Sequence, residues 1–338
     1  MFSAFNNRLR QVCLLLLIVL LAILLMEHLY IFMPGFLGAI TLYILLRGSY
    51  FYLTIIKKWN KTGIASLYIL ASMILIAIPI YFSIQLLSSK LIEFFSNPND
   101  LLANAKLVSN KLENATGIKI LSDHNIESFK ESARNIIPKI LNNSATVFAN
   151  FLIMFFILYY MLLSGRKIER KLYNSIPLKE NNIHLLSNET KNMIRANAIG
   201  IPVLAIIQGI VATIGYAIFG VQEYVLWGFL TGICSLLPVI GTAIIWVPLT
   251  AYYFAISNNS SAWGLLIYSV VLTTNIDYVA RLTLLKKFMD IHPVVTILGV
   301  IAGVSLFGFW GVIFGPLLIS YLIVLVKIYF NEFGKPSN

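Results

Sequence analysis

Residues 64–87 read IASLYILASMILIAIPIYFSIQLL, a run without one charged side chain. A helix needs about 20 mostly apolar residues to cross the hydrocarbon core of a bilayer. Residues 12–26, VCLLLLIVLLAILLM, form a second run, preceded by Arg8 and Arg10 and followed by no small-residue cleavage site. We therefore interpret it as an uncleaved first helix. The same criterion predicts spans at residues 9–26, 29–46, 64–87, 147–163, 198–219 and 262–280.

The composition excludes several protein classes. Of the 338 residues, 59% are hydrophobic and 12% are charged, whereas soluble domains carry about 25% charged residues. A water-soluble fold could not bury so much apolar surface, which excludes an ordinary cytosolic enzyme, a disordered tail and a secreted disulfide scaffold. Cys13 and Cys234 both lie in apolar runs. We predict an all-α fold, a polytopic α-helical membrane protein with about eight membrane segments.

The distribution of charge predicts the orientation in the membrane. The net charge is +11, and basic residues favour cytoplasmic loops, so we expect a bilayer and no nucleic acid as the partner. Residues 88–146 carry seven Lys and Arg against six acidic residues, whereas residues 164–197 carry seven against three. We therefore predict a small extracytoplasmic helical insertion at 88–146, between membrane helices 1–3 (1–87) and membrane helix 4 (147–163). Residues 164–197 and both termini are expected in the cytoplasm.

Two apolar stretches in the C-terminal region, 198–330, are too long for a single crossing. These are residues 225–256 and 293–328. If each crossed once, the basic loop 281–290 would lie outside the cell. If each entered and left on one side, with tips near 236–241 and 307–311, that loop would be cytoplasmic, as the charge bias requires. We favour the second topology, with two re-entrant helical hairpins.

The two stretches share a faint pattern of glycine and proline. Gly232, Gly241 and Pro248 in the first correspond in order to Gly303, Gly311 and Pro316 in the second. Inverted repeats with broken helices are one way to build a transporter site. Glycine and proline are also common in membrane helices, so the repeat and chance both remain open.

Helix-breaking residues at membrane depth indicate a permeation site. Pro238 and Gly241 fall at the first tip, and Gly308 and Gly311 at the second, with Pro316 shortly after. Backbone groups freed from a helix are costly in lipid unless protein or water satisfies them. Such breaks are therefore expected where the chain is buried or lines a cavity, although any single proline can simply kink a helix.

Polar residues within the predicted spans are further candidates for the pathway. Asn275, Asp277 and Arg281 lie in one span, where Asp277 and Arg281 either form a substrate or proton site or anchor the helix end as an interfacial pair. Gln208 with Gly209, and Ser235, could line a pathway or bond to neighbouring helices. No metal-ligand spacing, cofactor motif or ATP-binding Walker motif occurs, so we expect no metal, no cofactor and no ATP hydrolysis by this chain.

The order of these motifs resembles the autoinducer-2 exporter (AI-2E) family of bacterial membrane proteins. The resemblance covers essentially the whole chain and rests mainly on a series of short motifs: Gln208-Gly209, Trp227-Gly228, Leu237 to Gly241, Pro248, Asp277, Arg281, His292-Pro293 and the run Gly299 to Pro316. Family members often have Asn after the Asp and Pro after the Arg. Here Tyr278 and Leu282 occupy those positions, so whatever the missing residues recognise cannot be transferred.

The resemblance implies a multi-pass permease in the bacterial cytoplasmic membrane, homo-oligomeric (a pentamer by family resemblance) and independent of ATP. It leaves three hypotheses. The first is a secondary transporter that exports a small polar solute, such as autoinducer-2, between the two hairpins. The second is sodium(lithium)/proton antiport through Asp277. The third is a membrane scaffold that binds a partner through residues 88–146.

Overall fold

The computed structural model describes residues 2–96, 123–237, 240–286 and 293–334, and all regular elements within these ranges are helices. Six of these helical segments are long and apolar enough to cross a membrane, and three shorter apolar helices accompany them. The prediction of a polytopic helical membrane protein is confirmed. The six long segments are Leu9–Ile56, Lys61–Ser88, Ser144–Ser175, Glu180–Ile218, Asn259–Ala280 and Gly311–Phe333.

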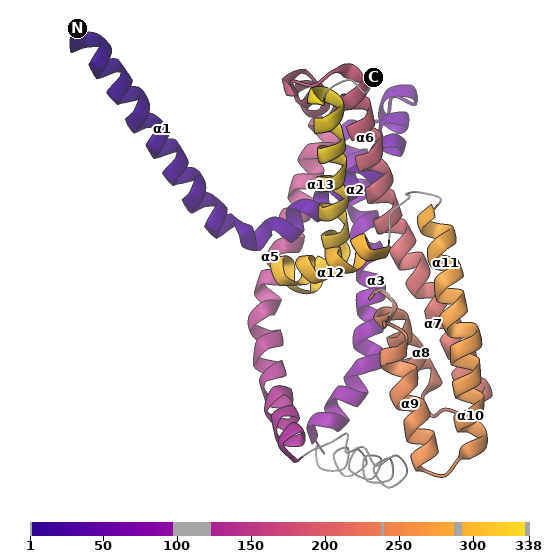
Figure 1. The fold of residues 1–338 in the computed structure, drawn as a ribbon. Helices are drawn as coiled ribbons and strands as arrows, with labels where there is room; N and C mark the ends of the chain where they lie inside the picture. Colours follow the sequence, from indigo (N-terminus) through magenta and orange to yellow (C-terminus); the bar gives the residue numbers. More distant parts are fainter. Residues whose placement is uncertain (1, 97–122, 238–239, 287–292, 335–338) are drawn as a thin grey trace.

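The N-terminal helix α1 (Phe2–Leu29) extends away from the other helices (Figure 1). Its side chains are exposed from residue 9 onward, and most of them are apolar, as expected for a helix surrounded by lipid. The chain changes direction at the 3₁₀ turn η1 (Tyr30–Phe32) before α2 (Met33–Phe51) begins. The predicted spans 9–26 and 29–46 place this break at Glu27-His28, between them, but the helix continues through both residues.

Asn150 satisfies the backbone at this change of direction. Its Oδ1 accepts a hydrogen bond from the Gly35 amide at 2.9 Å, and its Nδ2 donates to the Ile31 and Thr146 carbonyls at 3.0 Å. The bonds to Gly35 and Ile31 reach backbone groups beside the interruption between α1 and α2, where the regular helical pattern ends. A Cβ on Gly35 would lie 2.6 Å from the Asn150 carbonyl oxygen, so a side chain there would push the two helices apart.

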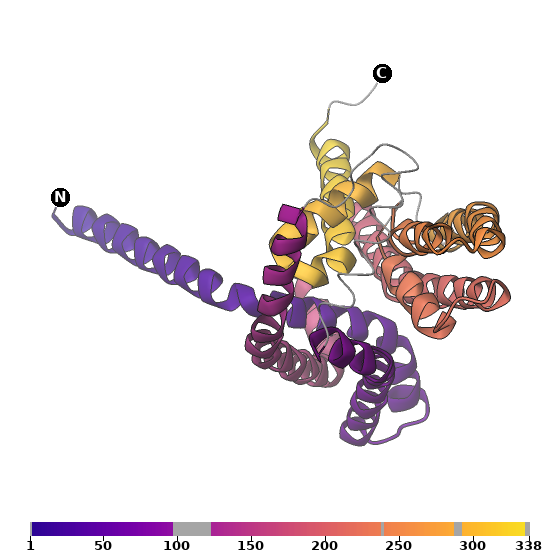
Figure 2. The same cartoon turned by 90° about the horizontal axis from the view of Figure 1, so that it is seen from below.

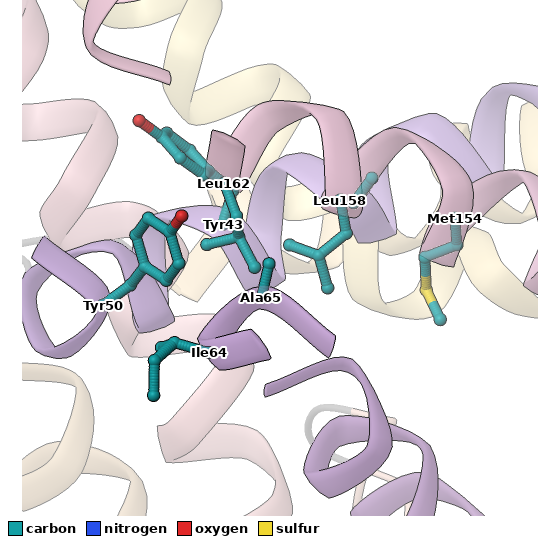
Figure 3. Packing of buried hydrophobic residues seen from close by; sticks show 8 residues of the cluster. Tyr43, Tyr50, Ile64, Ala65, Met154, Leu158 and Leu162 are labelled. Carbon is teal, nitrogen blue, oxygen red and sulfur yellow. The ribbon is translucent and has the colours of Figure 1, made fainter. Parts of the chain in front are cut away.

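The N-terminal core packs α2, α3 (Lys61–Ser96) and α5 (Asp123–Ser175) against one another. Both α3 and α5 extend into the expected insertion 88–146. Residues 97–122 of that insertion lie outside the described residues. At one end of the core, the Glu169 carboxylate accepts hydrogen bonds from Tyr43 and Arg47 at 2.7 and 2.9 Å. Figure 3 shows buried hydrophobic side chains from all three helices in one cluster: Tyr43, Tyr50, Ile64, Ala65, Met154, Leu158 and Leu162.

Helix α6 (Glu180–Arg195) connects the N-terminal core to the C-terminal helices. It packs against α13 (Gly311–Phe333) through Met193 and, with the following π-turn η3 (Ala196–Gly200), through Ala196. Val324 and Ile328 form the α13 side of this contact. The predicted basic segment 164–197 is therefore largely helical, because α5 continues to Ser175 and α6 begins at Glu180.

The remaining helices form a second group, separate from α2, α3 and α5, with α12 and α13 between the two groups (Figure 2). A core of small and aromatic side chains, including Ala212, Tyr216, Tyr253 and Ala262, holds the second group together. Its elements are α7 (Ile201–Ile218), α8 (Tyr224–Cys234), α9 (Ala243–Ala255), α10 (Asn259–Tyr268), the π-turn η4 (Ser269–Thr273) and α11 (Thr274–Lys286). Helix α12 (Pro293–Phe307) and the 3₁₀ turn η5 (Gly308–Trp310) then lead into α13.

Candidate functional site

Helix α7 places Gln208 in the interior of the second group. Its buried residues Leu204, Gln208, Ala212 and Gly215 recur at helical spacing, so one face of the helix is enclosed. Gln208 is fully buried, and its Nε2 donates to the Thr273 carbonyl oxygen of η4 at 3.4 Å. Its Oε1 has no hydrogen-bond partner.

Two hydroxyl groups of η4 share this lack of a partner. Ser269 and Thr273 are both 0% exposed, and neither side-chain oxygen has a hydrogen-bond partner. A buried polar group left unpaired costs about 1–3 kcal/mol, and π-turns often occur at functional sites. We name Gln208, Ser269 and Thr273 the oxygen cluster. The sequence singled out Gln208 but not the two hydroxyls, although their spacing of four residues could have indicated a shared face.

Gly209, next to Gln208, contributes to packing between α7 and α8. A Cβ on Gly232 would lie 3.1 Å from the Gly209 Cα and 2.6 Å from the Ala205 carbonyl oxygen. A Cβ on Gly228 would overlap the Thr213 side chain. The two helices therefore touch backbone to backbone, which is a common arrangement in membrane helices with small residues at the contact.

The first predicted helix break is present between α8 and α9. Helix α8 ends at Cys234 and α9 begins at Ala243. Ser235 is buried and donates to the Gly232 carbonyl at 2.7 Å, so its hydroxyl is used within the turn. A Cβ on Gly241 would lie 2.1 Å from the Cys234 carbonyl oxygen, because the turn folds back onto the end of α8. Pro238 lies outside the described residues.

The second predicted break is present between α12 and α13. Gly308 has a φ of +60°, a left-handed conformation that glycine adopts at little cost. After the turn the two helices pack closely, since a Cβ on Gly311 would lie 1.8 Å from the Gly303 carbonyl oxygen. Pro316 is buried in α13, and its Cα lies 2.5 Å from the position of a Cβ on Gly299.

The two stretches do not share one packing scheme. Gly303 and Gly311 meet across the α12–α13 hairpin, whereas their counterpart Gly232 packs against α7 and Gly241 packs against the end of its own helix. The glycine contact that matches α12–α13 is the one between α7 and α8. The faint pattern in the sequence therefore corresponds to different contacts in the two halves.

Aromatic side chains seat the second turn against the N-terminal helices. The Trp310 ring meets Phe151 of α5 edge to face, with ring centroids 6.0 Å apart. Phe307 stacks on Tyr30 of η1 at 5.8 Å, and the Tyr30 hydroxyl donates to the Leu306 carbonyl. Such aromatic pairs stabilise beyond the area they bury. The turn thus sits beside Asn150 and the bend that precedes α2.

The polar residues of α11 are only partly described. Asn275 is exposed, and its Nδ2 donates to the carbonyl oxygens of Val271 at 2.8 Å and Val270 at 3.3 Å on its own helix. Asp277 and Arg281 lie in α11, one turn apart, but their side chains are outside the described set. The candidate residues thus gather at the oxygen cluster, at the α8–α9 turn and at the α12–α13 turn, with Asn275 on the surface.

Comparisons with known proteins agree with this architecture. The family model described as "AI-2E family transporter" matches residues 13–331. A protein of Aquifex aeolicus named "Putative transport protein" is 25% identical over 297 residues, covering 81% of this chain and 84% of that protein. A relative in Methanocaldococcus jannaschii is 29% identical, and the match covers 79% of this chain and 81% of that protein. A relative in Helicobacter pylori is 30% identical, and the match covers 54% of this chain and 53% of that protein.

The family match extends across nearly the whole chain, from α1 to the end of α13. It therefore includes both helix breaks and the oxygen cluster. The similar proteins from Aquifex and Methanocaldococcus are matched over about four fifths of their own length, so the sequence similarity extends far beyond one shared helix. The chain belongs to the AI-2E transporter family.

Proposed function

We propose that this protein is a secondary transporter that exports a small polar solute, without ATP hydrolysis, along a path between the α8–α9 turn and the α12–α13 turn. The observation that carries the proposal is the pair of helix breaks. Both lie about midway between the ends of the molecule in Figure 1. Non-helical backbone at membrane depth is tolerated where protein buries it or where it lines a water-filled cavity.

The arrangement of the connections supports the proposed orientation. In Figure 1 the N-terminus, the α2–α3 connection, α6 and the end of α13 lie toward one end, and the α9–α10 connection lies at the opposite end. The first set contains the basic segments that favour the cytoplasm. We place the cytoplasm on that side, with both termini inside a bacterial cell, and we propose a homo-oligomer in the cytoplasmic membrane.

Fewer observations support the identity of the cargo than support the position of the path. An autoinducer-2-like cargo rests on the family name alone. The antiport hypothesis rests on Asp277, whose side chain lies outside the described set, and the scaffold hypothesis rests on 88–146, where residues 97–122 are not described. The helix breaks favour transport over a scaffold, because a scaffold has no need of them.

The experiment blocks the path after the protein has folded. Ile240, beside the first turn, is 63% exposed and is replaced by Cys in a chain whose Cys13 and Cys234 are Ala. Efflux of autoinducer-2 from proteoliposomes is measured before and after attachment of a bulky thiol reagent, and again after reduction. We expect flux to fall at least about tenfold, as for a reagent that blocks most of the pathway, and to recover on reduction.

The matched control is Ile256→Cys at the end of α9, where the side chain is 47% exposed but lies away from both turns. Its modification should leave flux unchanged. Flux that persists when Ile240→Cys is fully modified would exclude the proposed path. If the unmodified protein carries no autoinducer-2, that cargo is excluded and the blocking test is repeated with other small polar solutes.

A further inference from the structure

Basic side chains gather where α2 and α5 end and α3 begins, at the end of the molecule that carries the α2–α3 connection (Figure 1). The two segments of chain that meet there, residues 40–61 and 160–175, hold eight Lys and Arg residues and a single acidic residue, Glu169. We name the eight the basic surface: Arg47, Lys57, Lys58, Lys61, Arg166, Lys167, Arg170 and Lys171. All of them are exposed except Arg47, which is partly buried.

Contacts between α2 and α5 bring two of these arginines to one aromatic ring. The guanidinium carbon of Arg166, in α5, lies 5.2 Å from the centroid of the Phe51 ring at the end of α2. The guanidinium carbon of Arg47 lies 5.9 Å from the same centroid. The start of α3 is held beside them, because the Lys61 carbonyl oxygen accepts a hydrogen bond from the Tyr50 hydroxyl at 3.2 Å. Positive charges from separate helices are therefore fixed close together.

The single carboxylate of this region is already engaged. Glu169 accepts hydrogen bonds from Arg47 at 2.9 Å and from the Tyr43 hydroxyl at 2.7 Å. Within the described part of the chain, the Arg166 guanidinium forms no ion pair and no hydrogen bond, and the aromatic contact is what positions it. Arg170 follows about one helical turn later, so both arginines lie on the same side of α5. Their N–H groups are available to an anion from outside the chain.

Exposed apolar side chains border the basic surface. Ile56, the last residue of the π-turn η2 (Tyr52–Ile56), is 67% exposed, Trp59 is 55% exposed, and Leu172 near the end of α5 is 56% exposed. Tryptophan is typical of the level at which lipid head groups meet the hydrocarbon. A dissolved anion would leave these apolar groups in water. A phospholipid supplies a phosphate for the arginines and acyl chains for the apolar groups, so the mixture of charged and apolar surface favours a lipid.

We propose that the basic surface binds the phosphodiester head group of an anionic phospholipid, with Arg166 and Arg170 as the principal donors. A planar guanidinium presents paired N–H donors that match the oxygens of a phosphate. Basic sites between membrane helices on the cytoplasmic side are suited to such head groups. The choice of the cytoplasmic leaflet rests on the orientation proposed above, whereas binding of the head group needs neither that orientation nor transport. The lipid site can therefore fail its test while the proposed path stands, and the reverse also holds.

The experiment measures lipid binding to the purified full-length protein in an uncharged detergent. Phosphatidylglycerol and phosphatidylcholine with identical acyl chains are added separately. Bound lipid is counted by native mass spectrometry, and the thermal unfolding midpoint is followed in parallel, since a ligand that binds only the folded state raises it. We expect phosphatidylglycerol to bind more tightly and to raise the midpoint further. This difference should shrink with added salt, because salt screens exposed charges.

Arg166→Gln and Arg170→Gln each remove one positive charge and keep a polar side chain. Each should weaken phosphatidylglycerol binding about fivefold, and the double variant at least about tenfold, because every basic residue near the head groups adds to the attraction. Lys327→Gln is the matched control, since Lys327 is an exposed cation toward the same end of the molecule but lies on α13, outside the basic surface. If Arg166→Gln does not fold, Arg170→Gln decides the question.

Three results would overturn the proposal. The first is equal binding of phosphatidylglycerol and phosphatidylcholine by the unaltered protein, which would show no preference for the charged head group. The second is equal phosphatidylglycerol binding by Lys327→Gln and the double arginine variant, which would mean that overall charge attracts the lipid without a site. The third is an equal rise of the unfolding midpoint with soluble glycerol phosphate at the same concentration, which would identify the ligand as a dissolved anion.

Discussion

Two buried amides in membrane helices, Asn150 and Gln208, show how differently the halves of this molecule are built. Asn150 makes three hydrogen bonds, two of which join α5 to Gly35 of α2 and Ile31 of η1, while the third stays within α5. Gln208 makes one long bond and leaves its oxygen unpaired. In the described residues, all five buried unpartnered side-chain atoms come after residue 200. Polar groups thus stabilise the N-terminal half, whereas the C-terminal half keeps several of them available.

The means of packing also differ, although one glycine of the N-terminal half, Gly35, touches the backbone of Asn150. In the N-terminal core, large side chains such as Tyr43, Leu158 and Leu162 fill the space between helices. In the C-terminal half, α7 meets α8 and α12 meets α13 through glycine backbones. Contact between backbones leaves no side chain that can move aside. The C-terminal hairpins should therefore tolerate added volume poorly, although their polar groups are incompletely bonded.

The largest effect is expected for Gly311→Leu. The first carbon of the new side chain would overlap the Gly303 carbonyl, so α12 and α13 must separate. Overpacking in well-packed sites costs about 1–3 kcal/mol and occasionally more, and backbone on both sides places this position at or above the upper end. Thermal unfolding in detergent measures the loss. Gly48→Leu in α2, where a Cβ meets nothing within 4 Å, is the control. Similar losses of stability for Gly311→Leu and Gly48→Leu would contradict the idea that the α12–α13 hairpin tolerates added volume poorly.

A smaller effect is expected for Asn150→Leu, compared with Gln208→Leu. The first change leaves the buried Gly35 amide unpaired and should cost about 2 kcal/mol of unfolding free energy. The second removes an unpartnered oxygen and one long hydrogen bond, at 3.4 Å to the Thr273 carbonyl, and puts an apolar group of similar size in their place, so we expect a smaller loss of about 1 kcal/mol. Unfolding midpoints of the two variants provide the measurement. Equal destabilisation would mean that the two amides have the same structural role.

Of the two glycine variants, the smaller effect is expected for Gly308→Ala. Space is available at this position, and only the left-handed backbone conformation opposes a side chain. That conformation costs about 1–2 kcal/mol for residues other than glycine. The variant should therefore fold with a modestly lower unfolding midpoint than the parent. A loss as large as that of Gly311→Leu would show that the turn is crowded as well as strained.

The sequence predicted the features that depend on local composition. The apolar runs located the helices. Gly241, Gly308 and Gly311 located the two breaks, because glycine has no side chain and its backbone can adopt turn conformations that other residues avoid. Contacts between distant residues were not predictable. Asn150 and Gly35 are 115 positions apart, and nothing near either one identifies the other.

The oxygen cluster illustrates the same limit within the candidate site. Gln208 stood out because an amide within an apolar span is unusual. Ser269 and Thr273 did not, since hydroxyls in membrane helices usually bond to their own backbone, as Thr54 and Thr250 do. Only the π-turn and the facing α7 distinguish these two residues, and single-residue preferences do not predict a π-turn.

The glycine contact of the α12–α13 hairpin has a consequence for how this gene can vary. At Gly299, Gly303, Gly311 and Gly315, a Cβ would lie within 2.5 Å of backbone on the opposite helix. Every missense change of a glycine codon adds at least that carbon. No amino-acid replacement at these four sites is conservative, so an inherited change there should reduce the amount of folded protein whatever the new residue.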